Sequence, residues 1–417
     1  MTDVRLRPLG FREDEDGWIV GRVETGVCIA VPHAGKRAIE LLGSGRTILA
    51  TREELKAELG VELDVSGFVH DLAAVGMVAS IGDRVFADTG TPAPSLPWIT
   101  KGMVRWTLSP LLHCLMGLLV LGGVVAAALR PDVVPRWRSL LWSDHGTVVL
   151  LSEIALVAVL VSLHEFAHLL TARAAGIPGR IRVDTRLQFL AAQTDVSGIW
   201  LAERRIRLTV YLAGMAVDAS VLAGCLLTMA LSGGNTLLSV IALTEMTGLA
   251  LQFFIFMRTD LYFLVQDLAR CRNLYADATA FLLHLLRRAA RMPTAAPLAG
   301  MEPRQRRFVR IYSVLLVAGT GLCLGVFLLI SVPFTVALVA RSLGVLLLRH
   351  DNHHDDHHDG LVDAVDALLT LGVVVAYQGV WVRAWVRRHG PRVRSFIARL
   401  ARPARSAGLP GFSPPRD

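Results

Sequence analysis

Apolar residues along the chain change their pattern near residue 98. Beyond that point they come in runs of about twenty, the length needed to cross a hydrocarbon core of about 30 Å. The pattern therefore predicts a membrane protein with about six spans. The candidate spans are residues 110–129, 147–171, 208–231, 237–257, 311–332 and 361–382. Residues 333–348 are also apolar, enough to be re-entrant or interfacial.

The first 98 residues have the shorter periodicities of a small soluble domain. Residues 18–23 and 27–31 predict two paired strands, joined by the turn-prone Glu24-Thr25-Gly26. Thr51-Arg52-Glu53-Glu54 is a capping-box sequence and predicts that a helix begins there. With further helices at 33–42 and 64–75 and a closing strand at 77–81, the pattern indicates a winged-helix-like α+β module.

This division predicts three regions. Residues 1–98 form the N-terminal domain, and the segment 88–97, with three prolines, is its linker to the membrane part. Residues 99–275 hold the first four spans, and residues 276–417 hold the last two. The expected fold class is mainly α: a polytopic helical membrane protein with a small α+β domain at its N-terminus.

The composition supports a membrane location. Hydrophobic residues make up 53% of the chain, and the mean hydropathy is +0.49. The net charge of +8 could indicate nucleic acid binding, but in a membrane protein arginines gather in loops that stay in the cytoplasm. We therefore expect membrane lipid, and not nucleic acid, as the partner of these charges.

The arginines also predict the topology. Residues 172–207, 266–310 and 383–417 carry seven, nine and nine arginines, whereas residues 130–146 and 333–360 carry three and two. Since arginine-rich loops are cytoplasmic, both termini are expected in the cytoplasm.

The cysteines indicate neither a disulfide framework nor a thiolate metal site. The five cysteines are scattered, and no two of them form a CxxC pair. The charged residues 1–16 lack the apolar stretch of a signal peptide, so no cleavable signal peptide is expected.

The second predicted span contains the candidate metal ligands and general base. Its residues 164–168 read HEFAH, an HExxH motif. On a helix, His164 and His168 project from one face about one turn apart, where both imidazoles can bind one Zn²⁺. Glu165 would then act as the general base on the attacking water. Such polar groups are costly in an apolar span unless they are paired or functional, which favours a catalytic site over a structural polar cluster.

A catalytic zinc needs a third protein ligand at the same depth as the two histidines. His164 lies nine residues before Arg173, the first cationic residue on the inner side. Asp260 lies seven residues before Asp267, where a polar run begins. Both groups are thus expected about 11 Å inside the cytoplasmic edge. Depth therefore favours Asp260 as the third ligand.

Two other carboxylates are alternatives. Asp267 has nearly the same helical phase as Asp260, but it lies closer to the water boundary and is expected to be an interfacial carboxylate or a helix end. Asp218, in the third span, could orient a ligand histidine, line a substrate gate or be a buried hydrogen-bonded side chain.

A second histidine-rich segment covers residues 350–359. Its His353, His354, His357 and His358 can bind Zn²⁺ or Ni²⁺ loosely. Ligands this numerous lack the surrounding hydrogen bonds that fix a catalytic geometry. We interpret the segment as an outer loop that either collects metal as an accessory site or is simply solvated.

The residues around the HExxH motif resemble the site-2 protease class of intramembrane zinc proteases, and more closely its bacterial peptide zinc metalloproteases. The resemblance covers about residues 150–275 and implies three membrane helices around a buried zinc, in the bacterial cytoplasmic membrane. It is carried by HEFAHLLTARAAGI at 164–177, Asp195-Val196-Ser197 with Trp200, Ala213-Gly214, and Arg258–Tyr262 continuing to Asp267.

The chain departs from this family at the usual NxxPxxxLDG motif. Residues 252–261 read QFFIFMRTDL, with Gln252 at the Asn position and Leu261 where Gly is expected. The resemblance therefore carries the ligand role to Asp260. For Gln252 the expected role is to contact a ligand or to line a substrate gate.

The N-terminal domain resembles the PqqD-like peptide-binding domains of modified-peptide biosynthesis. The resemblance is carried by Gly17–Arg22, the helix after Pro32, and Val65–Val69 through Leu72 and Gly76. In that family a strand edge and an adjacent helix capture a leader peptide by β-augmentation. A generic protein-binding domain is the alternative.

These features predict a membrane-embedded zinc endopeptidase that cleaves a captured precursor peptide during maturation or export, with an ABC exporter as a possible partner. Regulated intramembrane proteolysis of a membrane-anchored regulator is the first alternative. The others are a non-proteolytic export or immunity component with structural zinc, and a metal transporter that uses residues 350–359.

Overall fold

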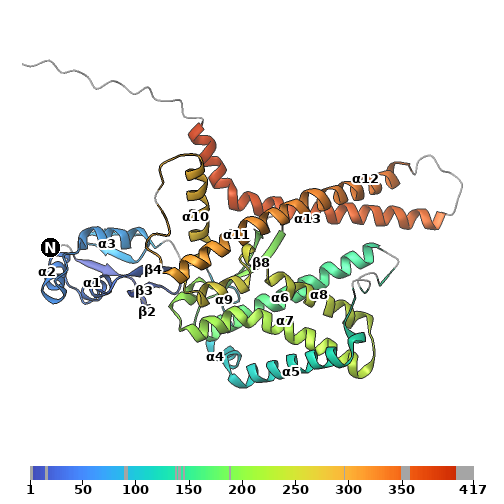
Figure 1. Ribbon diagram of the computed structural model, residues 1–417, viewed down its shortest axis with the longest axis horizontal. Coiled ribbons are helices and arrows are strands. Elements are labelled where there is room, and N and C mark those ends of the chain that lie inside the picture. The colour runs from blue at the N-terminus through green and yellow to red at the C-terminus, as the bar shows by residue number, and fades with distance from the viewer. Residues whose placement is uncertain are drawn as a thin grey trace, which may run out of the picture. The chain divides into compact units, whose positions relative to one another are not determined.

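The computed structural model describes residues 3–14, 17–88, 93–136, 139, 142–143, 146–186, 189–294, 296–348 and 357–400. The chain is mainly helical (Figure 1). It divides into two compact units. The first unit comprises Met1–Arg182 and Ala192–Ser331, and the second comprises Val183–Ala191 and Val332–Asp417. The HExxH motif and all three candidate carboxylates belong to the first unit.

The N-terminal domain contains two three-stranded antiparallel sheets beside three helices. One sheet has the order β2 (Gly10–Asp14), β3 (Gly17–Arg22), β4 (Val27–Val31), and the other the order β1 (Val4–Leu6), β5 (Val78–Ile81), β6 (Arg84–Val85). The helices are α1 (His33–Gly43), α2 (Ile48–Leu59) and α3 (Val65–Ala74). Apolar side chains from both sheets and all three helices form its core, among them Val20, Leu42, Leu55, Val69 and Val78.

Most elements predicted for this domain are present, but the start of α2 is not where the capping box indicated. The helix begins at Ile48, and the Thr47 side chain accepts a hydrogen bond from the backbone N–H of Ala50. Thr51 is buried inside the helix. Strands β1, β2 and β6 were not predicted, because each is short and β2 contains three charged residues.

Five helices among the described residues are long and apolar enough to cross a membrane. They cover Pro110–Leu129, Thr147–Ala174, Arg204–Ser232, Pro303–Leu329 and Ala364–Arg387. The corresponding elements are α5 (Pro110–Leu129), α6 (Gly146–Ala174), α7 (Arg204–Ser232), α11 (Pro303–Val326, continued by the π-helical Phe327–Ser331) and α13 (His357–Leu400). The short helices α4 (Lys101–Val104) and η1 (Arg105–Leu108) precede α5, and η2 (Pro131–Val133) follows it.

The predicted span 237–257 differs from the structure. Helix α8 (Thr236–Gln252) has 17 residues and is one of two shorter apolar helices. The chain then forms the 3₁₀ turn η5 (Ile255–Met257), and Arg258 adopts a left-handed conformation at φ +59°. A residue with positive φ cannot continue a right-handed helix. A new helix, α9, therefore starts at Asp260 and ends at Leu268.

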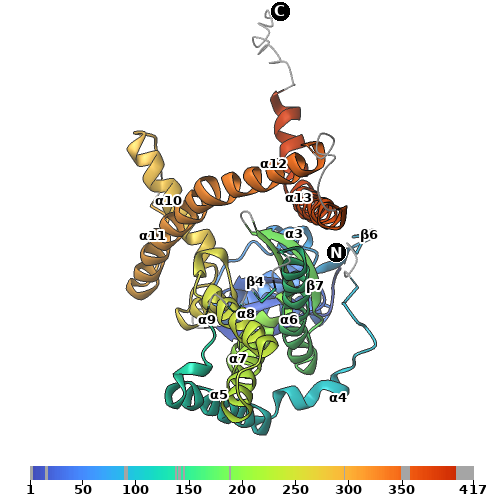
Figure 2. The same ribbon diagram turned by 90° about the vertical axis from the view of Figure 1, so that its right-hand side faces the viewer.

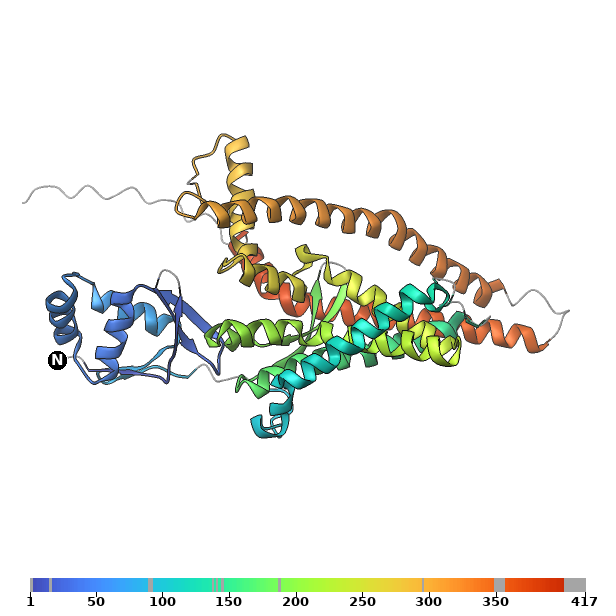
Figure 3. The ribbon, with the colours of Figure 1, turned by 60° about the horizontal axis from the view of Figure 1, so that its bottom comes forward.

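Helix α7 is the most enclosed of the five long helices. It packs against α5, α6, α8 and α9 (Figures 1 and 3). Gly123 of α5 lies against Ala223 of α7, where an added Cβ would overlap the Ala223 side chain. Small residues at such contacts let helix backbones approach closely in membranes. Helix α10 (Leu274–Ala289) packs against α11 (Figure 2).

Between α6 and α7 the chain forms a two-stranded sheet that was not predicted. Its strands are β7 (Arg180–Arg186) and β8 (Phe189–Asp195), and the 3₁₀ helix η4 (Ser197–Leu201) follows. The sequence had suggested only a cytoplasmic segment here.

The second unit contains α12 (Val332–Leu348), which packs against α13. The apolar residues 333–348 are thus helical. Of the predicted histidine-rich loop, His353 and His354 lie outside the described residues. His357 and His358 form the start of α13, so this part is helix and not loop.

Candidate metal centre

Helix α6 carries the HExxH motif on a face turned toward the protein interior. His164, Glu165 and His168 are 8%, 7% and 6% exposed. The two imidazole rings lie one helical turn apart, with 4.9 Å between their centroids. The neighbouring Leu163 is exposed on the same helix. The motif therefore faces inward from a helix with an apolar outer side.

Asp260, the first residue of α9, meets both histidines. Its Oδ2 lies 2.8 Å from His164 Nε2 and 3.2 Å from His168 Nε2, and the two Nε2 atoms are 3.1 Å apart. These three residues form a group that could hold one metal ion. They come from segments nearly one hundred residues apart, which the break between α8 and α9 brings together.

The other ring nitrogen of each histidine donates a hydrogen bond outward. His168 Nδ1–H donates to the carbonyl oxygen of Val210 at 2.7 Å, and His164 Nδ1–H donates to Asp218 Oδ2, also at 2.7 Å. A carbonyl oxygen can only accept, so His168 Nδ1 must carry the proton. In a neutral imidazole the Nε2 lone pair is then available toward Asp260.

Three acceptors therefore converge on one point: two Nε2 lone pairs and one carboxylate oxygen. Such a group is stable only around a proton or a metal cation. A tetrahedral zinc with bonds of about 2.0–2.2 Å places its ligand atoms roughly 3.4 Å apart. The observed separations of 2.8–3.2 Å are a few tenths of an ångström shorter, so a small outward movement would fit an ion. The residues suit a metal of this size and chemistry.

Gln252, the last residue of α8, holds Asp260 in place. Its side-chain N–H donates to Asp260 Oδ2 at 3.2 Å, and its Oε1 accepts from the Asp260 backbone N–H at 3.1 Å. The Thr259 hydroxyl donates to the Gln252 carbonyl oxygen at 2.6 Å. Gln252, at the end of α8, thus holds the carboxylate of Asp260 at the start of α9 in position.

Gly214 of α7 makes room for the His164 ring. A Cβ at this position would collide with the imidazole, and the glycine is in helical conformation, so the reason for glycine is space and not backbone freedom. Because α6 and α7 can approach this closely, His164 reaches Asp218 one turn further along α7.

Glu165 lies beside the histidines and bonds to a strand. Its Oε2 accepts a hydrogen bond from the Thr194 hydroxyl at 2.7 Å, and that hydroxyl is 3.0 Å from the Glu165 carbonyl oxygen. Thr194 belongs to β8 and is 7% exposed. The hydrogen bond fixes the position of the carboxylate.

Asp267, the alternative ligand, lies elsewhere. It forms a bidentate ion pair with Arg207, at 2.6 and 3.0 Å, and a second pair with Arg204 at 3.3 Å. The structure therefore places Asp218 beside a ligand histidine and Asp260 between the two histidines, while Asp267 belongs to an arginine cluster.

The sequence pointed to His164, His168, Asp260, Asp218 and Gln252, and the structure brings these five together. Thr194 was missed because it lies in a strand that had not been predicted, next to the Asp195-Val196-Ser197 segment. The Val210 carbonyl was missed because backbone acceptors carry no sequence signal.

Comparison with known proteins adds no assignment. The sequence matches no protein-family model, and neither the curated proteins nor the solved structures include a significant match to this chain.

Proposed function

We propose that this chain is a zinc endopeptidase of the membrane, with His164, His168 and Asp260 as the metal ligands. One observation carries the proposal: two imidazole nitrogens with their outer N–H groups already committed face a single carboxylate oxygen. Five apolar helices support the membrane location. A zinc ion bound there would make a water molecule nucleophilic near neutral pH and polarise a scissile carbonyl group.

Glu165 would be the general base. Glu165 follows His164 in α6, and the hydrogen bond from Thr194 gives its carboxylate a defined position. It would take the proton of the attacking water and pass it to the leaving amine. A purely structural metal site has no need of such a carboxylate, which favours proteolysis over a non-enzymatic role.

The substrate must present an extended backbone, because a helix hides its carbonyl groups in its own hydrogen bonds. The N-terminal domain offers a means of capture. Strand β4 is the edge of its three-stranded sheet, and an extended peptide could pair with it by β-augmentation. We propose a precursor peptide as the substrate, held by a domain of the PqqD-like, winged-helix kind and processed before export. Tethering would raise its concentration at the catalytic site.

The decisive experiment uses Glu165→Gln in the full chain reconstituted in lipid nanodiscs. Zinc content is measured by mass spectrometry of the metal, and cleavage is measured on a mixture of fluorescein-labelled peptides. The expected result is unchanged zinc and the loss of cleavage. Cleavage that persists in this variant would contradict the proposal.

The same preparation separates the other possibilities. Cleavage confined to peptides with a membrane-spanning segment would indicate proteolysis of a membrane-anchored regulator. Zinc without any cleavage in the unaltered chain would indicate a non-proteolytic component of export or immunity.

A further inference from the structure

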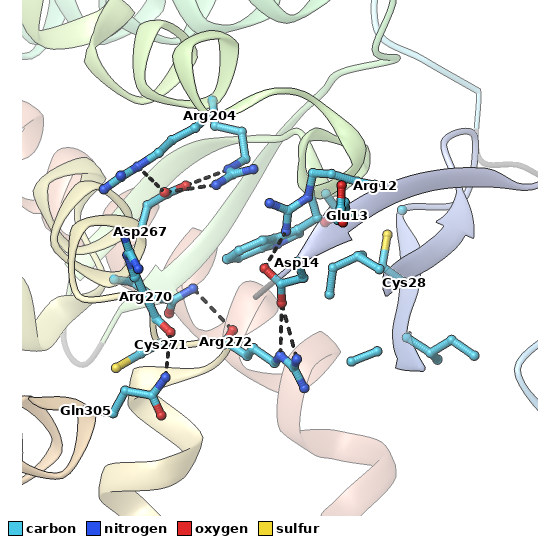
Figure 4. Close-up of a pocket in the computed structure, with 18 residues that line it drawn as sticks. Arg12, Glu13, Asp14, Cys28, Arg204, Asp267, Arg270, Cys271, Arg272 and Gln305 are labelled. Carbon is cyan, nitrogen blue, oxygen red and sulfur yellow. Dashed lines mark hydrogen bonds and ion pairs between the residues drawn. The ribbon is translucent and has the colours of Figure 1, made fainter. Parts of the chain in front are cut away.

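A pocket of about 810 Å³ lies in the first unit (Figure 4), and none of the candidate metal ligands lines it. Strands β2 and β4, the helix η4, the start of α7, the end of α9 and the turn that follows α9 all contribute to its lining. The volume is within the range of ligand sites, roughly 300–1,000 Å³. It is large enough for several amino-acid side chains but too small for a folded protein.

The lining is rich in arginine. Five guanidinium groups face three carboxylates, which leaves the pocket with two more positive than negative formal charges. The arginines are Arg12, Arg204, Arg207, Arg270 and Arg272, and the acidic residues are Glu13, Asp14 and Asp267. An excess of arginine in a pocket favours a ligand that carries carboxylate or phosphate groups.

Two of the carboxylates are each shared between two arginines. Asp267 binds Arg207 and Arg204, and Asp14 lies between Arg272, at 3.2 Å, and Arg12, at 3.7 Å (Figure 4). An arginine can form two parallel hydrogen bonds with one carboxylate. Sharing leaves donors of these arginines for a further acid group.

Arg12 shows the need for such a group most clearly. Its Nε is shielded from solvent and meets no hydrogen-bond acceptor among the described residues. Burial lowers the pKa of Arg12, and the nearby Arg207 guanidinium lowers it further. Two arginines from different elements thus repel each other across the pocket. A bound anion would relieve this repulsion.

Strand β4 in the lining favours an anionic peptide over an anionic lipid headgroup. Cys28, Ile29 and Ala30 of β4 line the pocket, and β4 is the edge strand of its sheet. A strand edge offers backbone N–H and C=O groups that pair with an extended peptide. A lipid headgroup has no extended backbone that could pair with these groups. The side chains of alternate peptide residues would point toward the arginines.

We propose that this pocket binds the carboxylate side chains of an acidic, extended segment of the peptide substrate. The inference rests on the proposed function and names its substrate class: peptides with Asp or Glu at alternate positions, next to the segment paired with β4. Arg12 and Arg204 contribute the binding charges, and β4 sets the direction of the peptide.

The test measures binding alone, so that its outcome does not depend on catalysis. Full-length Glu165→Gln protein in phosphatidylcholine nanodiscs is titrated into two fluorescein-labelled eight-residue peptides, in which Thr alternates with either Glu or Gln. Fluorescence anisotropy should give at least about tenfold tighter binding of the acidic peptide at low salt, the effect of one charged hydrogen bond. Arg12→Gln and Arg204→Gln should each remove most of this preference.

The matched control is Arg52→Gln. Its side chain is 55% exposed, similar to the 44% of Arg204, and it lies on α2 outside the pocket. This variant should keep the preference. Equal binding of the two peptides, or the same loss in all three variants, would overturn the inference. Co-purified anionic phospholipid that Arg12→Gln and Arg204→Gln both release would also overturn it and assign the arginines to a headgroup.

If the acidic peptide shows no tighter binding but the unaltered chain still cleaves peptides, only the inference about the pocket is wrong and the enzyme proposal is unaffected. If the unaltered chain prefers the acidic peptide but cleaves no peptide, the chain is instead a peptide-binding protein.

Discussion

His164 Nδ1 lies 2.7 Å from Asp218 Oδ2, a contact between two long apolar helices, α6 and α7. It fixes the orientation of the imidazole and directs Nε2 toward Asp260. Carboxylates that hold a histidine in this way are common behind metal ligands and raise the basicity of the ring. Of the three roles that the sequence left open for Asp218, this geometry favours that of orienting partner.

Asp218→Asn should weaken zinc binding by about 10- to 100-fold, as is usual when such a partner is lost. The amide can donate to Nδ1, which favours the tautomer that presents N–H to the metal. The measurement is competition with a zinc chelator of known affinity. Asp277→Asn, on α10 and remote from the histidines, is the control and should bind zinc normally. Equal affinities for both variants would remove Asp218 from the site.

Gly214→Ala should abolish zinc binding, since the added methyl group occupies the space of the His164 ring. Overpacking of this kind typically costs about 1–3 kcal/mol even where side chains can shift. Gly224→Ala is a close control because it lies on the same helix with nothing within 4 Å of the added Cβ. Zinc content and thermal unfolding of both variants separate the local effect from general instability. A Gly214→Ala protein with full zinc content would show that the ring is held differently.

Thr194→Val should reduce kcat for peptide cleavage by about 10-fold, less than the roughly 10²- to 10⁴-fold contribution of a general base itself, while zinc content stays the same. The valine keeps the shape but cannot donate to Glu165. Thr194→Ser restores the hydroxyl and should recover most of the rate. If valine and serine were equally active, the hydrogen bond to Glu165 would have no part in catalysis.

The thiol of Cys28 provides a reporter for the arginine pocket. Burial raises its pKa to about 11, against a smaller opposite influence from Arg12. The thiolate fraction, and with it the rate of alkylation by iodoacetamide, should therefore increase about tenfold for each pH unit between pH 8 and 10. The measurement is made with Cys114, which is exposed, replaced by Ser. Bound acidic peptide should slow the reaction. Fast alkylation near pH 7 would contradict the burial of this thiol.

The sequence predicted the candidate site better than its surroundings. HExxH spacing requires only that α6 be a helix, and Asp260 followed from matching the depths of two polar boundaries. The first inference uses a local rule, whereas the second compares the positions of two residues within their predicted spans. By contrast, Thr194 depends on β8, whose sequence runs from apolar Phe189 to polar Asp195 without alternation.

The number of spans was harder to predict because hydropathy does not show where a helix ends. The apolar run after Thr236 continues to Met257, yet the helix stops at Gln252. The left-handed Arg258 lies at the end of that run, and arginine is not a residue that marks such a turn in advance. The predicted start of α2 was wrong for a similar reason. Thr47 and Thr51 are both suitable N-cap residues, and the sequence alone does not decide which of them caps the helix.

His164, His168 and Asp260 surround the metal ion in the proposed site. The most direct measurement is the zinc content per chain of protein purified in nanodiscs, for the unaltered chain, Asp260→Ala and Asp267→Asn. We expect one zinc per chain in the unaltered protein and in Asp267→Asn, and none in Asp260→Ala. Zinc that is retained in Asp260→Ala but lost in Asp267→Asn would contradict it.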